Sequence, residues 1–286
     1  MDRRLTLERR GGKSGRLHQG LPERYGPWAL VAGASEGLGA AWAVALAERG
    51  MNLVLVARRR ILLDTLAEEL QRTSGVAVRC YDGDLAVPEF LKALQAACSN
   101  LDLGLVVCNA TDAPIGEFAS TPADGLMRVV DVNVRAPMVL LRAFLPGMVS
   151  RGRGGVVLMT SLTSNQGTPR IAAYAASKAF IRVLAEGLWH ELRDRGIDVL
   201  ACCAGAVRTP GYTQAAGKDA PGTLSPEEVV GRSLGVLGRR PVTIPGFVNR
   251  AASLFMSRLL PKRIAIAIMA NSTRGLAPAE ETRGGS

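Results

Sequence analysis

Short apolar runs alternate with helical segments along most of the chain, from Trp28 to Gly246. The runs are apolar almost without interruption, which is typical of parallel strands buried on both faces. The predicted strands are 28–32, 52–57, 76–81, 103–108, 156–159, 197–203 and 241–246. The predicted helices include one ending at Glu48, then 61–71, one opening at Pro88, 122–149 and 172–192. This alternation predicts an α/β fold with a doubly wound parallel sheet of about seven strands and helices on both faces.

The chain divides by composition into four parts. Residues 1–25 are polar, basic and contain glycine, so we expect a flexible N-terminal extension. Residues 26–246 hold the alternating pattern and form a single domain, as a chain of 286 residues allows. Residues 247–274 mix apolar and basic residues in a helical region, and residues 275–286 are expected to be a disordered tail. Within the long helix 122–149, two prolines should bend the helix or define its end.

The formal net charge of +10 is concentrated at the two ends of the chain. The first 25 residues carry +4 and residues 231–286 carry +7, whereas residues 26–230 carry −1. Basic ends favour anionic membrane surfaces or acidic ligands, and the alternative is that they are solvated tails. Aromatic residues make up 5% and no nucleic-acid-binding motif occurs, so nucleic acid is not an expected partner.

Targeting signals and cysteine spacing bear on the compartment. No secretory signal is visible, and no run approaches the ~20 apolar residues that cross a bilayer. The five cysteines show no metal-ligand spacing, and we interpret them as buried free thiols in a reducing compartment. We therefore expect a cytoplasmic protein without a metal site. Weak peripheral membrane contact through the C-terminal region stays open.

Three glycines, Gly33, Gly37 and Gly39, lie between the first predicted strand and the first helix. Glycine lets the backbone turn sharply and approach a pyrophosphate, and the helix N-terminus offers unpaired N–H groups. The alternative is that these glycines serve a tight turn only. Their position at the start of a strand–helix–strand unit favours dinucleotide binding.

The end of the second predicted strand indicates which dinucleotide binds. An acidic residue at this point would bind the ribose of NAD, but three arginines follow Ala57 and the first acid is Asp64. A guanidinium pairs well with a phosphate, so we expect NADP(H) in preference to NAD(H), with Arg58 as the best single candidate. Glu36 in the glycine loop weakens this inference slightly, and a solvated basic loop is the alternative.

Ser161, Tyr174 and Lys178 are the candidate catalytic side chains. Ser161 follows the fifth predicted strand, and Tyr174 and Lys178 lie four residues apart on a predicted helix, so they share a face. An ammonium beside a phenol favours phenolate and lowers its pKa, which makes Tyr174 a plausible proton donor and acceptor. The alternative, a core tyrosine beside a solvated lysine, would hold for this pair taken alone.

Taken in order, these motifs resemble the short-chain dehydrogenase/reductase family, single-domain type, over about residues 27–246. The motifs are the glycine loop, Asp84-Leu85, Asn109-Ala110, Asn133, Ser161 and Tyr174-x-x-x-Lys178. The resemblance implies a Rossmann-like fold and hydride transfer between nicotinamide and a ketone or secondary alcohol. It also implies a homodimer or homotetramer.

The resemblance implies roles for individual residues. Tyr174 is the acid/base, Lys178 lowers its pKa and binds the nicotinamide ribose, and Ser161 holds the substrate carbonyl oxygen. Asn133 supports a water-linked proton relay through Lys178. The residues implied in cofactor binding are Gly33, Ser35, Glu36, Gly37, Leu38, Gly39, Arg58, Asp84, Leu85, Asn109, Ala110, Tyr174, Lys178, Gly205, Val207 and Thr209.

Some positions depart from the family pattern, and the substrate end is the least patterned part. Ala32, Cys108, Thr111 and Ala204 stand where the family commonly has Thr, Asn, Gly and Pro. Residues 211–224 are small and glycine-rich, as expected of a mobile substrate lid, and Ser225 should cap the helix that follows.

The apolar, basic region after residue 246 could wall a hydrophobic pocket, meet another subunit or lie on a membrane. We expect a lipophilic carbonyl substrate, similar to a ketosteroid or a 3-ketoacyl group. The alternatives are a non-catalytic NADP-binding sensor or scaffold, and a peripheral membrane module.

Overall fold

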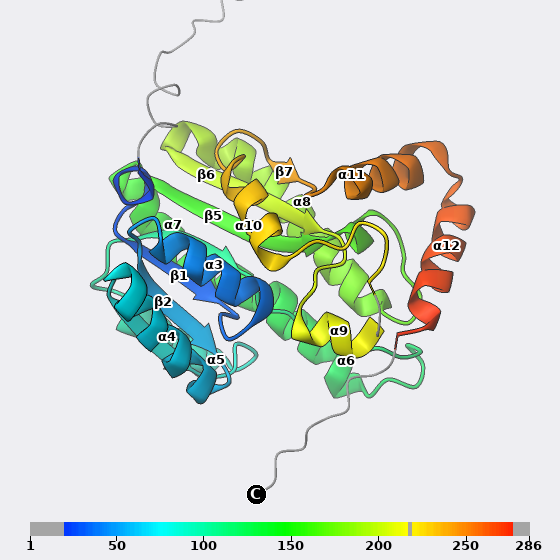
Figure 1. Cartoon of the computed structure of the whole chain (residues 1–286), viewed down its shortest axis with the longest axis horizontal. Helices are drawn as coiled ribbons and strands as arrows, with labels where there is room; N and C mark the ends of the chain where they lie inside the picture. The colour runs from blue at the N-terminus through cyan, green and yellow to red at the C-terminus, as the bar shows by residue number, and fades with distance from the viewer. Residues whose placement is uncertain (1–19, 217–218, 277–286) are drawn as a thin grey trace, which may run out of the picture.

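Seven parallel strands form one sheet, ordered β3-β2-β1-β4-β5-β6-β7, in the computed structural model, which describes residues 20–216 and 219–276 (Figure 1). The strands are β1 (Trp28–Ala32), β2 (Asn52–Ala57), β3 (Val78–Asp82), β4 (Leu103–Cys108), β5 (Gly154–Ser161), β6 (Ile197–Ala204) and β7 (Val242–Thr243). Every neighbouring pair is parallel. The predicted doubly wound sheet is confirmed. Because strand order reverses between β1 and β4, a ligand is expected at the carboxyl ends of these strands.

Helices cover both faces of the sheet and create two hydrophobic cores. The main helices are α3 (Gly37–Ala47), α4 (Arg60–Ser74), α5 (Pro88–Ala97), α6 (Ala123–Val130), α7 (Ala136–Arg151), α8 (Ala172–Leu192) and α10 (Pro226–Leu234). One core joins α3, α4 and α10 to the sheet, and the other joins α5, α7 and α8. Strand β1 contributes side chains to both cores. Val31 lies in the first and Leu30 in the second, because successive side chains of a strand point to opposite faces of the sheet.

The start of the described chain differs from the expected flexible extension. Residues Leu21–Tyr25 form the short helix α2, and Tyr25 is fully buried. Both Arg24 and the Tyr25 hydroxyl reach Asp198 at the start of β6, at 2.5 and 3.1 Å. Burial and this ion pair therefore place residues 20–25 with the domain. The rest of the predicted extension, residues 1–19, lies outside the described residues.

The last strand is shorter than expected. Only Val242 and Thr243 pair with β6, whereas the sequence pattern predicted a strand over 241–246. Pro241 and Pro245 flank the pairing, and neither has an N–H to donate to a ladder. The strand is therefore short, and Val242 and Thr243 pair only with β6 at this edge of the sheet.

The long helix predicted over 122–149 is interrupted by a wider turn. The π-helical segment η1 (Asp131–Arg135) separates α6 from α7. Pro137 lies in the first turn of α7 and has no N–H, so it cannot donate to the carbonyl of Asn133 four residues earlier. Pro146, by contrast, lies inside α7 without ending it. The combined stretch Ala123–Arg151 is long and apolar enough to cross a membrane, but α7 packs into a core, as in many soluble proteins.

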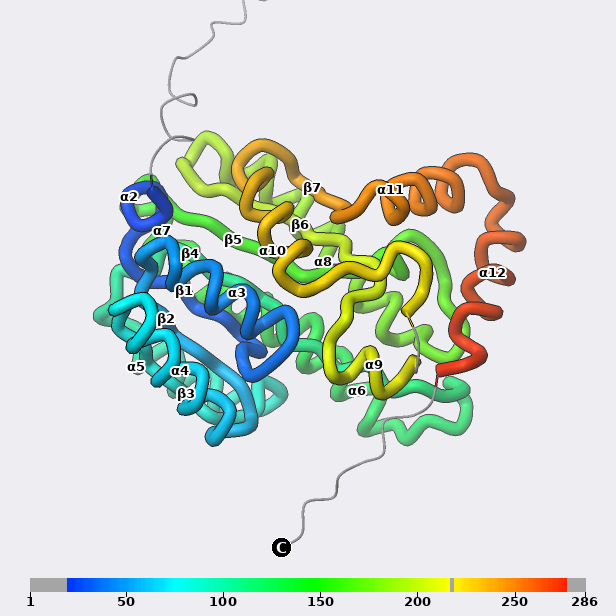
Figure 2. Tube along the Cα trace, in the orientation of Figure 1, coloured from blue at the N-terminus to red at the C-terminus, as the bar shows by residue number. Residues whose placement is uncertain are grey.

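Beyond the sheet, residues 247–274 form the C-terminal arm. The arm comprises α11 (Phe247–Leu254), the π-helical segment η4 (Phe255–Leu259) and α12 (Lys262–Arg274). Figure 2 shows α11 leading away from β7 and α12 turning along the same side of the molecule. Between β6 and α10, the predicted lid contains α9 (Pro210–Ala216). Ser225 caps α10 in a reciprocal bond pattern with Glu228, as predicted.

Candidate active site

The glycine loop sits at the carboxyl end of β1, where the strand order reverses. A Cβ on Gly39 would lie 1.8 Å from the carbonyl oxygen of Gly33, and one on Gly33 would lie 2.6 Å from the backbone of Ala110. Both glycines are therefore required for close backbone approach. Helix α3 begins at Gly37, and no side chain caps its first turn. Its unpaired N–H groups fit a pyrophosphate, so the residues present suit a dinucleotide.

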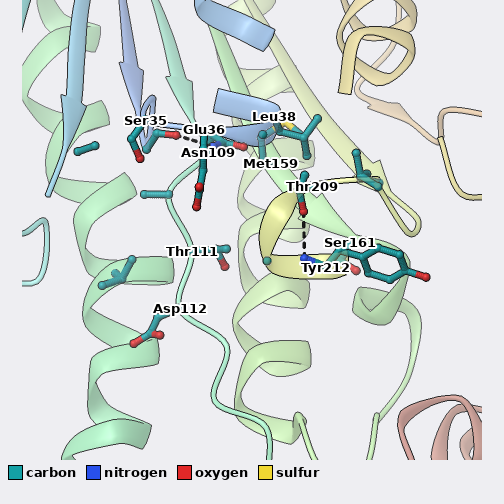
Figure 3. Close-up of a pocket in the computed structure, with 18 of the residues that line it drawn as sticks. Ser35, Glu36, Leu38, Asn109, Thr111, Asp112, Met159, Ser161, Thr209 and Tyr212 are labelled. Atoms are coloured by element: carbon teal, nitrogen blue, oxygen red, sulfur yellow. Dashed lines mark hydrogen bonds between the residues drawn. The ribbon is translucent and has the colours of Figure 1, made fainter. Parts of the chain in front are cut away.

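One cavity of about 510 Å³ runs from this loop across the ends of the central strands to α8. Figure 3 shows Ser35, Glu36 and Asn109 near one end and Ser161 near the other. All but two of the predicted site residues line it: Gly33, Ser35, Glu36, Gly37, Leu38, Arg58, Asp84, Leu85, Asn109, Ala110, Ser161, Tyr174, Lys178, Gly205, Val207 and Thr209. The exceptions are Gly39, which packs behind the loop, and Asn133. The volume is in the range typical of small-molecule sites.

The predicted catalytic side chains converge at the α8 end of the cavity. Ser161 is the last residue of β5, and its Oγ accepts a hydrogen bond from Thr163 N at 3.2 Å. Lys178 is buried and its Nζ donates to the carbonyl of Met159 at 3.0 Å. The same Nζ lies 5.6 Å from the centre of the Tyr174 ring. The strand end and the helix face therefore bring a hydroxyl, a phenol and an ammonium to one place.

Burial dominates the acid–base properties of this cluster. It lowers the pKa of Lys178 to about 8, because a buried ammonium loses its hydration. Burial raises the pKa of Tyr174, and the neighbouring Ser161 hydroxyl acts in the opposite direction. The expected lowering of the Tyr174 pKa by Lys178 is not met in this structure, because desolvation of the phenol dominates and only the Ser161 hydrogen bond opposes it. Tyr174 is consequently held as a neutral phenol, the form that donates a proton.

Asn133 occupies a different position from the one its predicted role suggested. Its side-chain amide exchanges two hydrogen bonds with the backbone of Asp112, at 2.7 and 2.9 Å, and donates to Ser177 Oγ at 3.0 Å. The side chain therefore fastens the chain after β4 to α8 and does not line the cavity. A proton relay at this residue would use its main-chain carbonyl, to which Pro137 cannot donate.

The arginines after β2 have different partners. Arg59 pairs with Glu36 at 2.7 Å and donates to Ser35 Oγ at 3.1 Å. Glu36 is thereby neutralised within the loop, which removes the objection that its charge raised against a phosphate. Arg58 lines the cavity and is exposed, so it can reach a phosphate on the adenosine ribose.

Arg128 is a cavity residue that sequence analysis missed. It comes from α6 and bridges Asp84, at 2.8 Å, and Asp112, at 3.1 Å. Burial alone would raise the pKa of Asp84, but hydrogen bonds from Arg128 and the Ala86 amide, with the charges of Arg128 and Arg58, lower it overall. Asp84 is thus an ionised acceptor at the expected adenine end. No motif marks Arg128, because only tertiary packing brings α6 to this edge.

Tyr212 is a second residue that sequence analysis missed. It lies in α9 and lines the cavity near Ser161, and its amide donates to Thr209 Oγ1 at 3.2 Å (Figure 3). Its hydroxyl accepts from the amide of Ala220 at 3.1 Å. Tyr212 thus ties the first half of the predicted lid to the second, beside the catalytic cluster.

Comparison with known proteins identifies the class. A family model described as short chain dehydrogenase matches residues 27–219. The chain therefore belongs to the short-chain dehydrogenase family, and the predicted resemblance is confirmed. Its members' chemistry makes it an NAD(P)-dependent oxidoreductase acting on CH–OH and C=O groups.

Among individual relatives, 7beta-hydroxysteroid dehydrogenases stand out. The chain is 31% identical over 242 residues to that of Mediterraneibacter gnavus, covering 81% of this chain and 90% of the relative. It is 30% identical over 231 residues to that of Clostridium sardiniense, covering 80% and 88%. An inactive hydroxysteroid dehydrogenase-like protein 1 of Homo sapiens is 32% identical over 187 residues, covering 63% and 55%.

Solved structures agree with this placement. A structure described in work on 7beta-hydroxysteroid dehydrogenase stereoselectivity superposes with a TM-score of 0.83 at 29% identity, covering 88% of this chain and 99% of that one. A short-chain dehydrogenase from Sphingobium yanoikuyae in complex with NADPH gives a TM-score of 0.72 at 34% identity, covering 82% and 96%.

Proposed function

We propose that this protein is an NADP(H)-dependent oxidoreductase that interconverts a bulky, lipophilic ketone and its secondary alcohol, with a ketosteroid as the leading substrate class. The observation that carries the reaction is the convergence of Ser161, Tyr174 and buried Lys178 at one end of the nucleotide cavity. The substrate class draws on the relatives named as hydroxysteroid dehydrogenases. A 3-ketoacyl group is the competing class.

The preference for NADP(H) is supported by the charges after β2. Both Arg58 and Arg59 line the cavity, but Arg59 is paired with Glu36, which leaves Arg58 as the better candidate for a phosphate. A guanidinium in this position pairs with a ribose phosphate, and no carboxylate follows β2 to bind a free ribose hydroxyl. The NADPH complex of the Sphingobium yanoikuyae relative adds independent support. NAD(H) remains the weaker ligand in this proposal.

The mechanism follows from the side chains at the α8 end. When bound, the nicotinamide supplies a hydride to the carbonyl carbon of the substrate. Ser161 donates a hydrogen bond to the carbonyl oxygen, and Tyr174 gives its phenolic proton to that oxygen as the new C–H bond forms. Lys178 is fixed by the carbonyl of Met159 and stabilises the phenolate that remains. The product is the alcohol, and Tyr174 regains its proton from solvent.

The test is NADPH oxidation by the purified protein with steroid ketones, 3-ketoacyl thioesters and small aromatic ketones. The wild type should turn over a steroid ketone, and Tyr174→Phe should lose about 10²–10⁴-fold in rate, the usual contribution of a general acid. NADPH binding, followed by fluorescence, should survive the substitution. Normal turnover by Tyr174→Phe would overturn the mechanism, and activity confined to thioesters would overturn the substrate class.

The same experiment separates an enzyme from a non-catalytic NADP-binding sensor or scaffold. A sensor would bind NADPH but reduce none of the ketones, and Tyr174→Phe would be indistinguishable from the wild type. The cluster argues for catalysis, because a buried lysine and tyrosine are costly to retain without use.

We propose further that the protein is a homodimer or homotetramer in the cytoplasm. Large apolar side chains are exposed along α6, α7 and α8, which suits a subunit contact: Met127, Val130, Met138, Phe180 and Val183. All five cysteines are free thiols, which suits a reducing compartment. Light scattering during gel filtration gives the subunit number, and a monomeric result would contradict the first part.

A further inference from the structure

The C-terminal arm reverses the usual placement of polar and apolar side chains. In α11 the buried residues are Asn249 and Ser253, whereas Phe247 is 76% exposed. Among the described residues, seven of the fifteen large apolar side chains that are exposed belong to the arm. Five of these lie in α11 and η4: Phe247, Val248, Leu254, Phe255 and Leu259. An exposed apolar concentration of this kind marks a surface that a partner covers.

Polar contacts fix the arm in this orientation. The Asn249 amide donates to the carbonyl of Gly222 at 3.0 Å, and Asn165 donates to Ser253 Oγ at 2.9 Å. At the far end, Thr273 Oγ1 also donates to a carbonyl of the domain. No described residue of the arm belongs to either hydrophobic core. The arm is therefore held by its polar side chains, and its apolar face points away from the domain.

The apolar face of the arm lies outside the catalytic cavity. None of the described residues that line the catalytic cavity comes from the arm. The structure therefore gives the arm's apolar face no part in the walls of this cavity. A membrane and a second copy of the chain are the two candidate partners for the apolar face of the arm.

The charge of the arm distinguishes a membrane from a second copy of the chain as the partner of its apolar face. Residues 247–276 contain five basic residues and no acidic one: Arg250, Arg258, Lys262, Arg263 and Arg274. Two such arms facing each other across a symmetric contact would repel. An anionic lipid surface satisfies both features, because it accepts apolar side chains below the headgroups and cations among them.

We propose that the C-terminal arm docks the protein on an anionic membrane surface, with the apolar face of α11 and η4 in the interface and the arginines among the lipid phosphates. This role does not depend on which ketone the enzyme reduces. Since the arm is bonded to Gly222 in the lid segment and to Asn165 just after Ser161, docking places the lid and catalytic end beside the bilayer.

The test is flotation of the full-length protein with vesicles of phosphatidylcholine, with and without phosphatidylserine. The wild type should float with phosphatidylserine vesicles and much less without them. Arg258→Gln/Arg263→Gln should weaken binding about 25-fold, or about fivefold for each cation. Phe255→Ser/Leu259→Ser should weaken it at least about tenfold, since each side chain loses its burial. A matched pair on α4, Ile61→Ser/Arg72→Gln, should bind as the wild type does.

Wild-type protein that stays unbound to phosphatidylserine vesicles would overturn the proposal. So would arm variants that bind normally. If the wild type does not bind vesicles and the arm variants change the number of subunits, a second copy of the chain covers the apolar face of the arm. Thermal melting and NADPH binding check that each variant folds. Should an arm variant misfold, the wild type still decides, because raising the salt concentration must release it from the vesicles.

Discussion

The two ends of the catalytic cavity achieve function by opposite means. At the glycine loop, the backbone makes the site, and even a methyl group on Gly39 would collide with Gly33. At the α8 end, specific side chains make the site, and burial sets the pKa values of Tyr174 and Lys178. One end therefore depends on the absence of side chains, and the other depends on polar groups held out of water.

This contrast shows where each end is vulnerable. The loop tolerates no added volume, since its shape presents N–H groups to a phosphate. Helix α8 tolerates added volume wherever its surface is open, but each change in a buried polar group alters proton affinity. The same type of substitution should therefore have opposite results at the two ends.

Gly39→Ala should have the largest effect of the four changes considered next. Its Cβ would sit 1.8 Å from the Gly33 carbonyl, so the loop and the start of α3 must shift. We expect about 3 kcal/mol of destabilisation, at the upper end of overpacking costs, with loss of NADPH binding. Urea unfolding and cofactor titration measure the two effects. A Gly39→Ala variant with normal stability and full affinity for NADPH would show that the glycine loop does not depend on the absence of side chains.

Arg58→Gln should follow in size. Removing the guanidinium that faces the cavity should weaken NADPH binding about tenfold and leave NADH binding nearly unchanged. Arg59→Gln is the matched control, because Arg59 is paired with Glu36 and should matter less to the phosphate. Equal losses for NADPH and NADH, or a larger loss in the control, would contradict the assignment.

The pH dependence of stability probes the α8 end. The pKa of Lys178 is about 8 in the folded protein against a reference value of 10.5, so between these values the unfolded state binds more protons. Stability from this group therefore rises with pH. From pH 7 to pH 9, the wild type should gain about 1 kcal/mol relative to Lys178→Met, which does not titrate. Paired urea melts measure this difference, and a flat difference would show that burial does not control the lysine.

Gly187→Ala should have the smallest effect and the opposite sign. Gly187 lies within α8, and no neighbour stands within 4 Å of a Cβ placed there. Alanine should stabilise the helix by about 0.5–1 kcal/mol without changing kcat, because it reduces the freedom of the unfolded chain. Thermal melting and steady-state kinetics test this, and a destabilised variant would mean that something in solution packs against this face.

Much of the fold and site could be predicted because the signals are local. The span 172–192 for α8 and the strand 52–57 coincide with the structure, since continuous apolar runs and helix-forming residues fix such elements in place. The spacing of the three glycines similarly predicts the tight turn of the loop between β1 and α3. These features need only neighbouring residues to be interpreted.

Other features depend on residues far apart in the chain. Arg128 reaches Asp84 and Asp112 only because the fold brings α6 beside the segments that follow β3 and β4. The direction of the Tyr174 pKa shift depends on burial by the whole fold, which charge pairing in the sequence does not reveal. The orientation of the arm depends on Asn249 and Ser253, two small polar residues whose partners lie 27 and 88 positions away. Such contacts leave no periodic pattern.

The π turn at Asp131–Arg135 has a consequence for the phase of the long helix around it. One extra residue in a turn rotates every later side chain by about 100° relative to an unbroken α-helix. The stretch before the turn can therefore aim Arg128 at the nucleotide cavity while Leu140 and Phe144 after it face the core. Deleting one residue there would leave two intact helices out of step, with either the cofactor pocket or the hydrophobic layer misaligned. The π turn thus sets the rotation of α7 relative to α6, so that the two helices can face different surfaces.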